Sequence, residues 1–115
     1  MNGGLIDYNK MLEAQKDDKI LILDVRENSE IQETGKLPGS IHIPMKEVMN
    51  ELNLSNEEFE KTYGKKKPSL DTQIITSCRL GGRSAKVQAE LQNAGYKNVL
   101  NYSGGWADWE KHQKK

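Results

Sequence analysis

A continuous apolar run, Ile20 to Val25, sets the strongest limit on the fold of this chain. It reads Ile-Leu-Ile-Leu-Asp-Val, and apolar character over this length is typical of a strand buried on both faces of a parallel sheet. Shorter runs predict further strands at residues 41–43, 73–77 and 98–102. Helical patterns accompany them at residues 7–16, 45–52, 55–63, 84–94 and 106–113. The alternation predicts an α/β domain with a mostly parallel sheet of four to five strands flanked by helices.

Several of the predicted helices carry signals at their ends. Asp7 is placed to cap the first helix, and Ser55 with Glu58 three residues later forms a capping-box pattern. Gly64 and Gly95 follow two of the helical patterns, at positions where glycine commonly ends a helix. Ligands of α/β sheets bind beyond the carboxyl ends of the strands, so functional residues are expected just after the strands.

Length and composition narrow the class of protein. The chain has 115 residues, which predicts a single domain spanning residues 1–115. Lys plus Arg and Asp plus Glu number 17 each, so no charge excess favours nucleic acid or an anionic membrane as a partner. No targeting pattern or membrane-spanning run is visible, and one cysteine suggests a reducing compartment, so we expect a cytoplasmic protein. The two histidines and the cysteine lack metal-ligand spacing, so we expect no metal and no cofactor.

The cysteine, Cys78, heads the segment that carries the chemistry. The segment lies between a predicted strand and a predicted helix and reads Cys-Arg-Leu-Gly-Gly-Arg-Ser. A lone cysteine is most often a small buried hydrophobe. Here glycines, two arginines and a helix start surround it, a setting that lowers a thiol pKa and holds an anion. We therefore expect Cys78 to be the catalytic nucleophile, with a substrate-binding loop made of Arg79, Leu80, Gly81, Gly82, Arg83 and Ser84.

The size of this loop bears on the reaction. Protein tyrosine phosphatases and dual-specificity phosphatases have five residues between the cysteine and the arginine of a similar loop, whereas four separate Cys78 from Arg83. A shorter loop makes a tighter ring of N–H donors around the sulfur. The hypothesis that follows is that the loop fits one extra sulfur atom better than a tetrahedral phosphate.

Blocks spread over nearly the whole chain resemble the single-domain rhodaneses, which are sulfurtransferases. The matching blocks are Leu23–Glu27, Gly35–Pro44, Cys78–Ser84, Gly95–Val99 and Gly104–Trp106. The segment Glu57–Pro68 further resembles the small thiosulfate sulfurtransferases of animals, some of which pass sulfur to glutathione. The resemblance implies a rhodanese-like fold and sulfurtransferase activity.

The resemblance also implies a mechanism of covalent catalysis. Cys78 would attack thiosulfate or another sulfane donor, release sulfite and hold the sulfur as a persulfide within the loop amides. A thiol such as glutathione, a sulfur-accepting protein, or cyanide would then remove it. Arg79 would draw in the anionic donor, and Arg83 would brace the loop. Neither nucleic acid nor a membrane is implied.

Alternatives remain open at this stage. The loop could serve a cysteine-dependent phosphatase or arsenate-reductase-like enzyme, a persulfide carrier, or a non-catalytic interaction module. Asp24 and Arg26 are expected to form a structural network, and His42 a packing or hydrogen-bonding contact. Trp106 could pack the last helix or line the mouth of the site. The run Lys65–Lys67 could be a solvated loop or attract an anionic acceptor.

Overall fold

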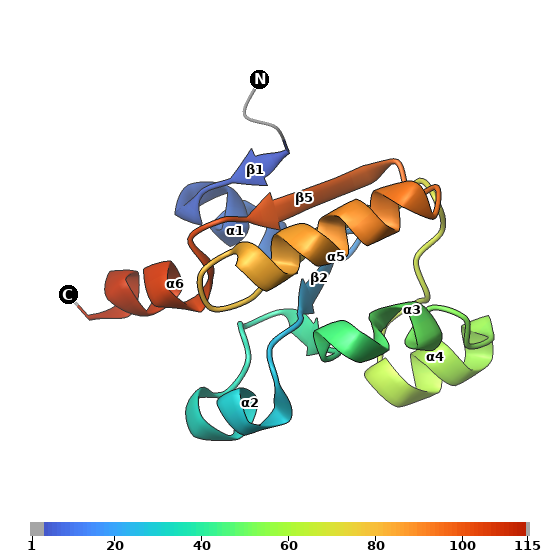
Figure 1. Cartoon of the computed structure of the whole chain (residues 1–115), viewed down its shortest axis with the longest axis horizontal. Helices are drawn as coiled ribbons and strands as arrows, with labels where there is room; N and C mark the ends of the chain where they lie inside the picture. The colour runs from blue at the N-terminus through green and yellow to red at the C-terminus, as the bar shows by residue number, and fades with distance from the viewer. Residues whose placement is uncertain (1–3, 115) are drawn as a thin grey trace.

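The computed structural model describes residues 4–114 and contains a five-stranded parallel sheet with strand order β1-β5-β4-β2-β3 (Figure 1). The strands are β1 (Leu5–Ile6), β2 (Leu21–Asp24), β3 (Ser40–His42), β4 (Gln73–Ser77) and β5 (Asn98–Tyr102). The helices are α1 (Tyr8–Gln15), α2 (Asn28–Thr34), α3 (Val48–Glu51), α4 (Asn56–Tyr63), α5 (Gly82–Asn93) and α6 (Gly105–Gln113), with a 3₁₀ turn at Met45–Glu47. The predicted α/β class and parallel sheet are confirmed.

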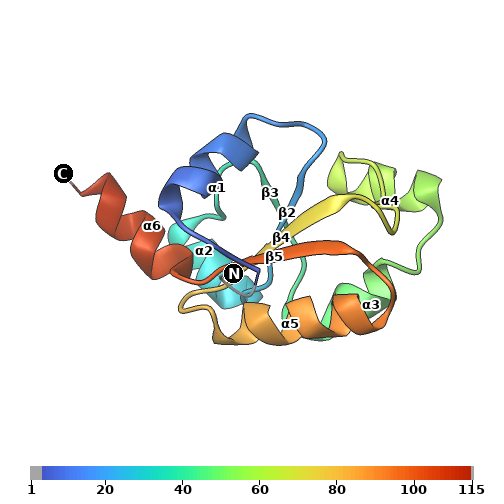
Figure 2. The same ribbon diagram turned by 90° about the horizontal axis from the view of Figure 1, so that it is seen from above.

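Helices cover both faces of the sheet, with α1 and α6 on one side and α3 and α5 on the other (Figure 2). Successive strand residues point to opposite faces, so the inner strands β2, β4 and β5 contribute to two cores. Ile22 and Ile75 pack with Met11 and Trp109 on the first side. Leu23 packs on the second side with apolar residues of the other helices, among them Val48, Phe59, Val87 and Leu91. This double burial explains why β2 is apolar along its length.

The register of the sheet aligns the carboxyl ends of its central strands. Asp24 at the end of β2 pairs with Ser77 at the end of β4, and on its other side with His42 of β3. Residues that follow these strands therefore gather at one edge. Cys78, which follows β4 directly, lies at this edge beside the end of β2.

Two elements lack a counterpart among the predictions. Strand β1 has only two residues, and helix α2 contains no buried residue, so neither produces an apolar pattern. Helix α5 begins at Gly82, two residues earlier than predicted. The segment predicted as one helix at residues 45–52 divides into the 3₁₀ turn and α3.

The helix-end signals correspond to observed contacts. The Asp7 carboxylate accepts a hydrogen bond from the Lys10 N–H at 3.0 Å, and the Ser55 hydroxyl accepts one from the Glu58 N–H at 3.1 Å. Gly64 has a φ of 73°, the left-handed conformation that closes α4.

Candidate active site

Cys78 is 1% exposed and sits between the end of β4 and the start of α5. The chain turns sharply here, and Gly81 adopts a φ of +92°. A Cβ atom at Gly81 would lie 2.4 Å from the Ser103 carbonyl oxygen, closer than packed atoms approach. The absence of a side chain therefore lets the loop pack closely against the backbone of Ser103, which follows β5.

Two donors converge on the sulfur of Cys78. The Gly81 N–H lies 3.0 Å from Sγ, and the Ser84 hydroxyl lies 3.3 Å from it. Burial raises the pKa of the Cys78 thiol, but hydrogen bonds from the Ser84 hydroxyl and from the N–H groups of Ser84, Leu80 and Gly81 lower it further than burial raises it. The net effect is a pKa below the ordinary value, so the site favours the thiolate.

Neighbouring strands fix the first turn of α5 around these donors. The Thr76 hydroxyl donates to the Ser84 carbonyl at 3.0 Å, and the Asn101 side-chain amide donates to the Gly81 carbonyl at 3.2 Å. Thr76, Ser84 and Asn101 are all buried. The donors therefore face the sulfur in the resting structure, and little rearrangement is needed when a charge forms there.

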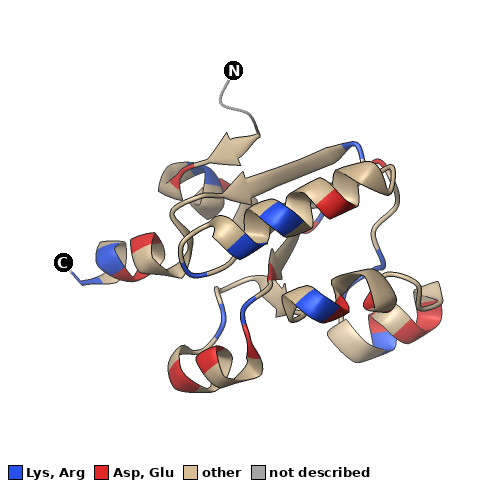
Figure 3. Ribbon diagram, in the orientation of Figure 1, with Lys and Arg blue, Asp and Glu red and all other residues tan. Residues whose placement is uncertain are grey.

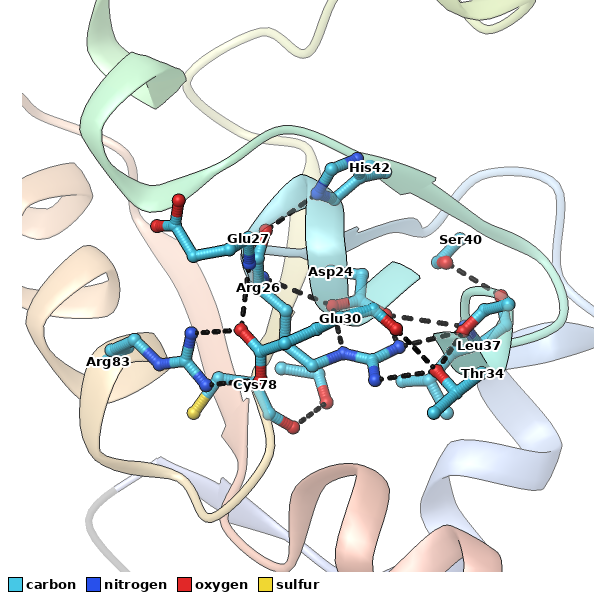
Figure 4. Close-up of polar contacts among 12 residues, drawn as sticks. Asp24, Arg26, Glu27, Glu30, Thr34, Leu37, Ser40, His42, Cys78 and Arg83 are labelled. Atoms are coloured by element: carbon cyan, nitrogen blue, oxygen red, sulfur yellow. Dashed lines mark hydrogen bonds and ion pairs between the residues drawn. The ribbon is translucent and has the colours of Figure 1, made fainter. Parts of the chain in front are cut away.

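Arg83 is tied to α2. Its Nη1 and Nη2 atoms lie 2.6 Å and 3.0 Å from the two carboxylate oxygens of Glu30 (Figure 4). Hydrogen bonding to Arg83 lowers the pKa of Glu30 to about 2, and the same hydrogen bonding raises the pKa of Arg83. Figure 3 shows the acidic positions on α2 and the basic positions along α5. Glu30 was not among the predicted site residues, although Glu27 and Glu30 have capping-box spacing and form that box at the start of α2.

The outer part of the loop faces solvent. Leu80 is 73% exposed, and Arg79 and Gly82 are also exposed. Arg79 forms no ion pair with any residue in the described range 4–114. Of the two loop arginines, it is thus the one whose charge is not already matched by a carboxylate.

Asp24 and Arg26 form a buried pair near the same edge. Arg26 is 1% exposed, and its Nε and Nη2 atoms donate to the two Asp24 carboxylate oxygens at 3.0 Å and 2.8 Å (Figure 4). The guanidinium also donates to Thr34 and Gly35 at the end of α2. His42 Nε2 lies 2.6 Å from the Arg26 carbonyl, a contact in which the ring nitrogen must donate. These contacts agree with the structural roles expected for all three residues.

Of the two remaining candidates, Lys65–Lys67 lies far from Cys78 and Trp106 lies beside it. Lys65–Lys67 lies between α4 and the start of β4, whereas Cys78 follows the end of that strand. A five-residue strand spans about 17 Å, so the lysines and the sulfur lie at opposite edges of the sheet. Trp106, by contrast, touches the loop, because its backbone N–H donates to the Cys78 carbonyl at 2.8 Å.

Within residues 4–114, no group of acidic, histidine or cysteine side chains is arranged to hold a metal ion, and no helix is long and apolar enough to cross a membrane. The site holds a buried cysteine sulfur among fixed N–H and O–H donors that lower its pKa, with Arg79 at its rim. Such a site can attack an electrophilic atom and keep the resulting anion hydrogen-bonded.

The rhodanese-like domain family matches this chain over residues 7–112. The chain belongs to that family. A rhodanese domain-containing protein of Drosophila melanogaster is 34% identical over 106 residues, covering 92% of this chain and 96% of the fly protein. A putative mitochondrial thiosulfate sulfurtransferase of Schizosaccharomyces pombe is 35% identical over 112 residues, covering 94% and 78% of the two chains.

A human sequence and a human structure are also similar to this rhodanese-like domain. The human thiosulfate:glutathione sulfurtransferase is 29% identical over 89 residues, which is 76% of each chain. The solved structure of a human single-domain sulfurtransferase superimposes with a TM-score of 0.83 over 99% of both chains at 23% identity. At that identity the superposition establishes the shared fold.

Proposed function

We propose that this rhodanese-like protein is a sulfurtransferase that carries sulfane sulfur on Cys78. The donor is thiosulfate or another sulfane compound, and the acceptor is a thiol such as glutathione, or cyanide. The observation that carries the proposal is the convergence of the Gly81 N–H and the Ser84 hydroxyl on Cys78 Sγ, at 3.0 Å and 3.3 Å. Relatives named as thiosulfate sulfurtransferases support it.

In the first half-reaction, the Cys78 thiolate attacks the outer sulfur of thiosulfate. The new bond joins Sγ to that sulfur, the S–S bond of thiosulfate breaks, and sulfite leaves with its electron pair. The persulfide that remains is ionised and extends the thiolate by one atom. The Gly81 N–H and the Ser84 hydroxyl stabilise the thiolate charge on Sγ, and the surrounding loop N–H groups stabilise the persulfide charge on the outer sulfur.

In the second half-reaction, an acceptor thiolate attacks the outer sulfur of the persulfide. The Cys78–sulfur bond breaks and its electron pair returns to Sγ, so the enzyme recovers the thiolate without an external oxidant or reductant. With cyanide the product is thiocyanate. The two halves together make a ping-pong reaction.

The loop arginines have separate roles in this proposal. Arg79, exposed and without an ion pair among the described residues, attracts the anionic donor and orients it towards Sγ. Arg83 holds α5 against α2 through Glu30 and adds positive potential beside the sulfur. The exposed Leu80 and Gly82 contribute their backbone to the wall of the site.

The cytoplasmic location expected from the sequence remains part of the proposal. A reducing compartment keeps a free thiol available and supplies glutathione at the same time. The relative from S. pombe is named as mitochondrial, so cell fractionation is the measurement that separates the two locations.

Mass spectrometry after treatment with thiosulfate tests the proposal. The peptide containing Cys78 should gain the mass of one sulfur atom and lose it again on addition of glutathione or cyanide. Cys78→Ser protein should gain no mass and transfer no sulfur. Transfer by Cys78→Ser protein would overturn the mechanism. Hydrolysis of p-nitrophenyl phosphate by protein that forms no persulfide would favour the phosphatase alternative, and a bound partner protein without persulfide would favour the interaction module.

The choice of acceptor needs a second measurement on the persulfide form. Rapid discharge by glutathione supports a small-molecule acceptor. If glutathione does not remove the sulfur but an acceptor protein does, this rhodanese-like protein is a persulfide carrier.

A further inference from the structure

The loop carbonyls at Cys78 and Arg79 are held by the first turn of α6. The Trp106 N–H donates to the Cys78 carbonyl at 2.8 Å, and the Ala107 N–H donates to the Arg79 carbonyl at 3.1 Å. The first N–H groups of a helix have no partner within the helix. In α6, two of them take their acceptors from the loop that carries the thiol.

The second of these contacts bears on where a loop N–H group points. In a trans peptide the C=O and N–H bonds point in opposite directions. The Arg79 carbonyl shares a peptide with the Leu80 N–H, so turning that carbonyl towards α6 turns the N–H towards the opposite side, where the sulfur lies. The Leu80 N–H is one of the groups that lower the pKa of Cys78.

Close approach of α6 to the loop depends on Gly105. This residue has a φ of +60°, and a Cβ atom placed on it would lie 2.4 Å from the Cys78 carbonyl oxygen and 2.5 Å from that of Arg79. A side chain at this position would push α6 away from the loop. The glycine therefore permits the two hydrogen bonds just described.

Arg26 contacts the first turn of α6 through the ring of Trp106. The guanidinium carbon of Arg26 lies 4.7 Å from the centroid of the Trp106 ring, within the range of a cation–π contact. The Trp106 indole N–H is buried and has no hydrogen-bond partner among the described residues. The ring is thus held by packing and by the face it offers to Arg26, whose own position is set by Asp24, Thr34 and Gly35.

We propose that Arg26 and Trp106 are positioning residues for Cys78: they fix the first turn of α6, which holds the Arg79 carbonyl and so turns the Leu80 N–H towards the sulfur. Neither side chain needs to touch the substrate. The inference deepens the proposed function, on which its catalytic meaning rests, but its structural content concerns the thiolate alone.

The test is the rate of Cys78 alkylation by iodoacetamide as a function of pH, which requires no sulfur donor. Trp106→Leu removes the aromatic face, so we expect the midpoint of the pH profile to rise by about one unit, a tenfold loss of thiolate at lower pH. The limiting rate at high pH should not fall. Trp106→Phe keeps an aromatic ring, so its midpoint should stay close to that of wild type. Arg26→Lys lacks the planar guanidinium and should shift the midpoint in the same direction as Trp106→Leu.

Trp109→Leu is the matched control. Trp109 lies three residues further along α6, is buried, and packs against Tyr8 at a ring distance of 5.3 Å. Its loss should lower the melting temperature and leave the alkylation midpoint in place. The charged residues around the thiolate, Arg79, Arg83 and Glu30, are the same in all these variants.

An unchanged midpoint in folded Trp106→Leu protein would overturn the inference, as would an equal rise in Trp109→Leu. Circular dichroism at the assay temperature establishes that each variant is folded. If Arg26→Lys does not fold, the Trp106 pair decides the matter. Failure of the proposed function is distinguishable, because protein that forms no persulfide still yields an alkylation profile.

Discussion

Glu30 and Arg83 join helices α2 and α5 across 53 positions of sequence. Each guanidinium Nη atom of Arg83 donates to one carboxylate oxygen of Glu30. At its other end α2 is held by Arg26, which donates to Thr34 and Gly35. Helix α2 buries no residue in the core. Helix α2 is therefore held in place by contacts with Arg26 and Arg83 and not by hydrophobic packing. Both arginines lie close to the Cys78 loop.

Loss of the Glu30 carboxylate should reduce stability in a pH-dependent way. The pKa of Glu30 falls from an ordinary 4.5 to about 2 in the folded protein, so its contribution is complete above pH 4.5 and is lost as the pH falls towards 2. Glu30→Gln should lower the free energy of unfolding in urea by roughly 0.5–1 kcal/mol at pH 7, a difference that shrinks below pH 4. Glu33→Gln, an exposed change in the same helix, is the control, and equal behaviour of the two variants would contradict the assignment.

Removal of the Ser84 hydroxyl should make Cys78 harder to ionise. The hydroxyl lies 3.3 Å from Sγ and contributes to the lowered pKa of Cys78. In Ser84→Ala the midpoint of Cys78 alkylation should rise by about one to two units, as expected for one hydrogen bond to a charged group. Ser40→Ala removes another buried hydroxyl, which donates to Leu37, and should leave the midpoint unchanged. A profile identical to that of wild type in Ser84→Ala would show that the hydroxyl does not serve the thiolate.

Two glycine substitutions should separate backbone strain from steric conflict. Gly64 and Gly81 both have positive φ, at 73° and 92°, but an added Cβ meets nothing within 4 Å at Gly64 and the Ser103 carbonyl at 2.4 Å at Gly81. Gly64→Ala should lower the free energy of unfolding by about 1 kcal/mol, the strain of a left-handed L-residue. Gly81→Ala should lower it at least twice as much and slow Cys78 alkylation at neutral pH. Equal decreases in the free energy of unfolding would mean that the Cys78 loop can shift to accommodate a side chain at Gly81.

Arg79 should affect use of the donor more than the thiol itself. Arg79→Ala should reduce kcat/KM for thiosulfate about tenfold, because a charge-assisted contact to an anion is lost. The reduction should shrink as ionic strength rises, since salt screens the wild-type attraction. Lys86→Ala removes an exposed charge from α5 and should leave kcat/KM unchanged. If the rate of Arg79→Ala protein depends on thiosulfate concentration as that of wild type does, Arg79 does not bind the donor.

Elements with an apolar signature were predictable, and elements without one were not. The run at Ile20–Val25 predicted the buried strand β2, and Asp7 and Ser55 marked the starts of α1 and α4 correctly. Helix α2 escaped because it packs through polar contacts, and β1 because two residues are too short for any periodicity. Strand order depends on contacts between distant segments, which local patterns do not report.

The candidate site shows the same division. The position of Cys78 between a strand and a helix followed from local sequence, as did the proximity of Gly81 and Ser84. The partner of Arg83 did not, because Glu30 lies in the unpredicted helix. The contact of Trp106 with the loop carbonyl was also hidden, since it joins two backbone segments and leaves no mark on residue type.

The backbone N–H of Leu80 is one of the groups that lower the pKa of Cys78, and the side chain of Leu80 lies in solvent. Every residue type except proline supplies the same N–H, so the side chain at this position can vary in size and polarity without altering the nucleophile. The side chain of Leu80 is thus free to diverge during evolution, whereas its backbone is constrained by the sulfur. One residue can therefore change the surface beside the thiol without changing the reactivity of the thiol.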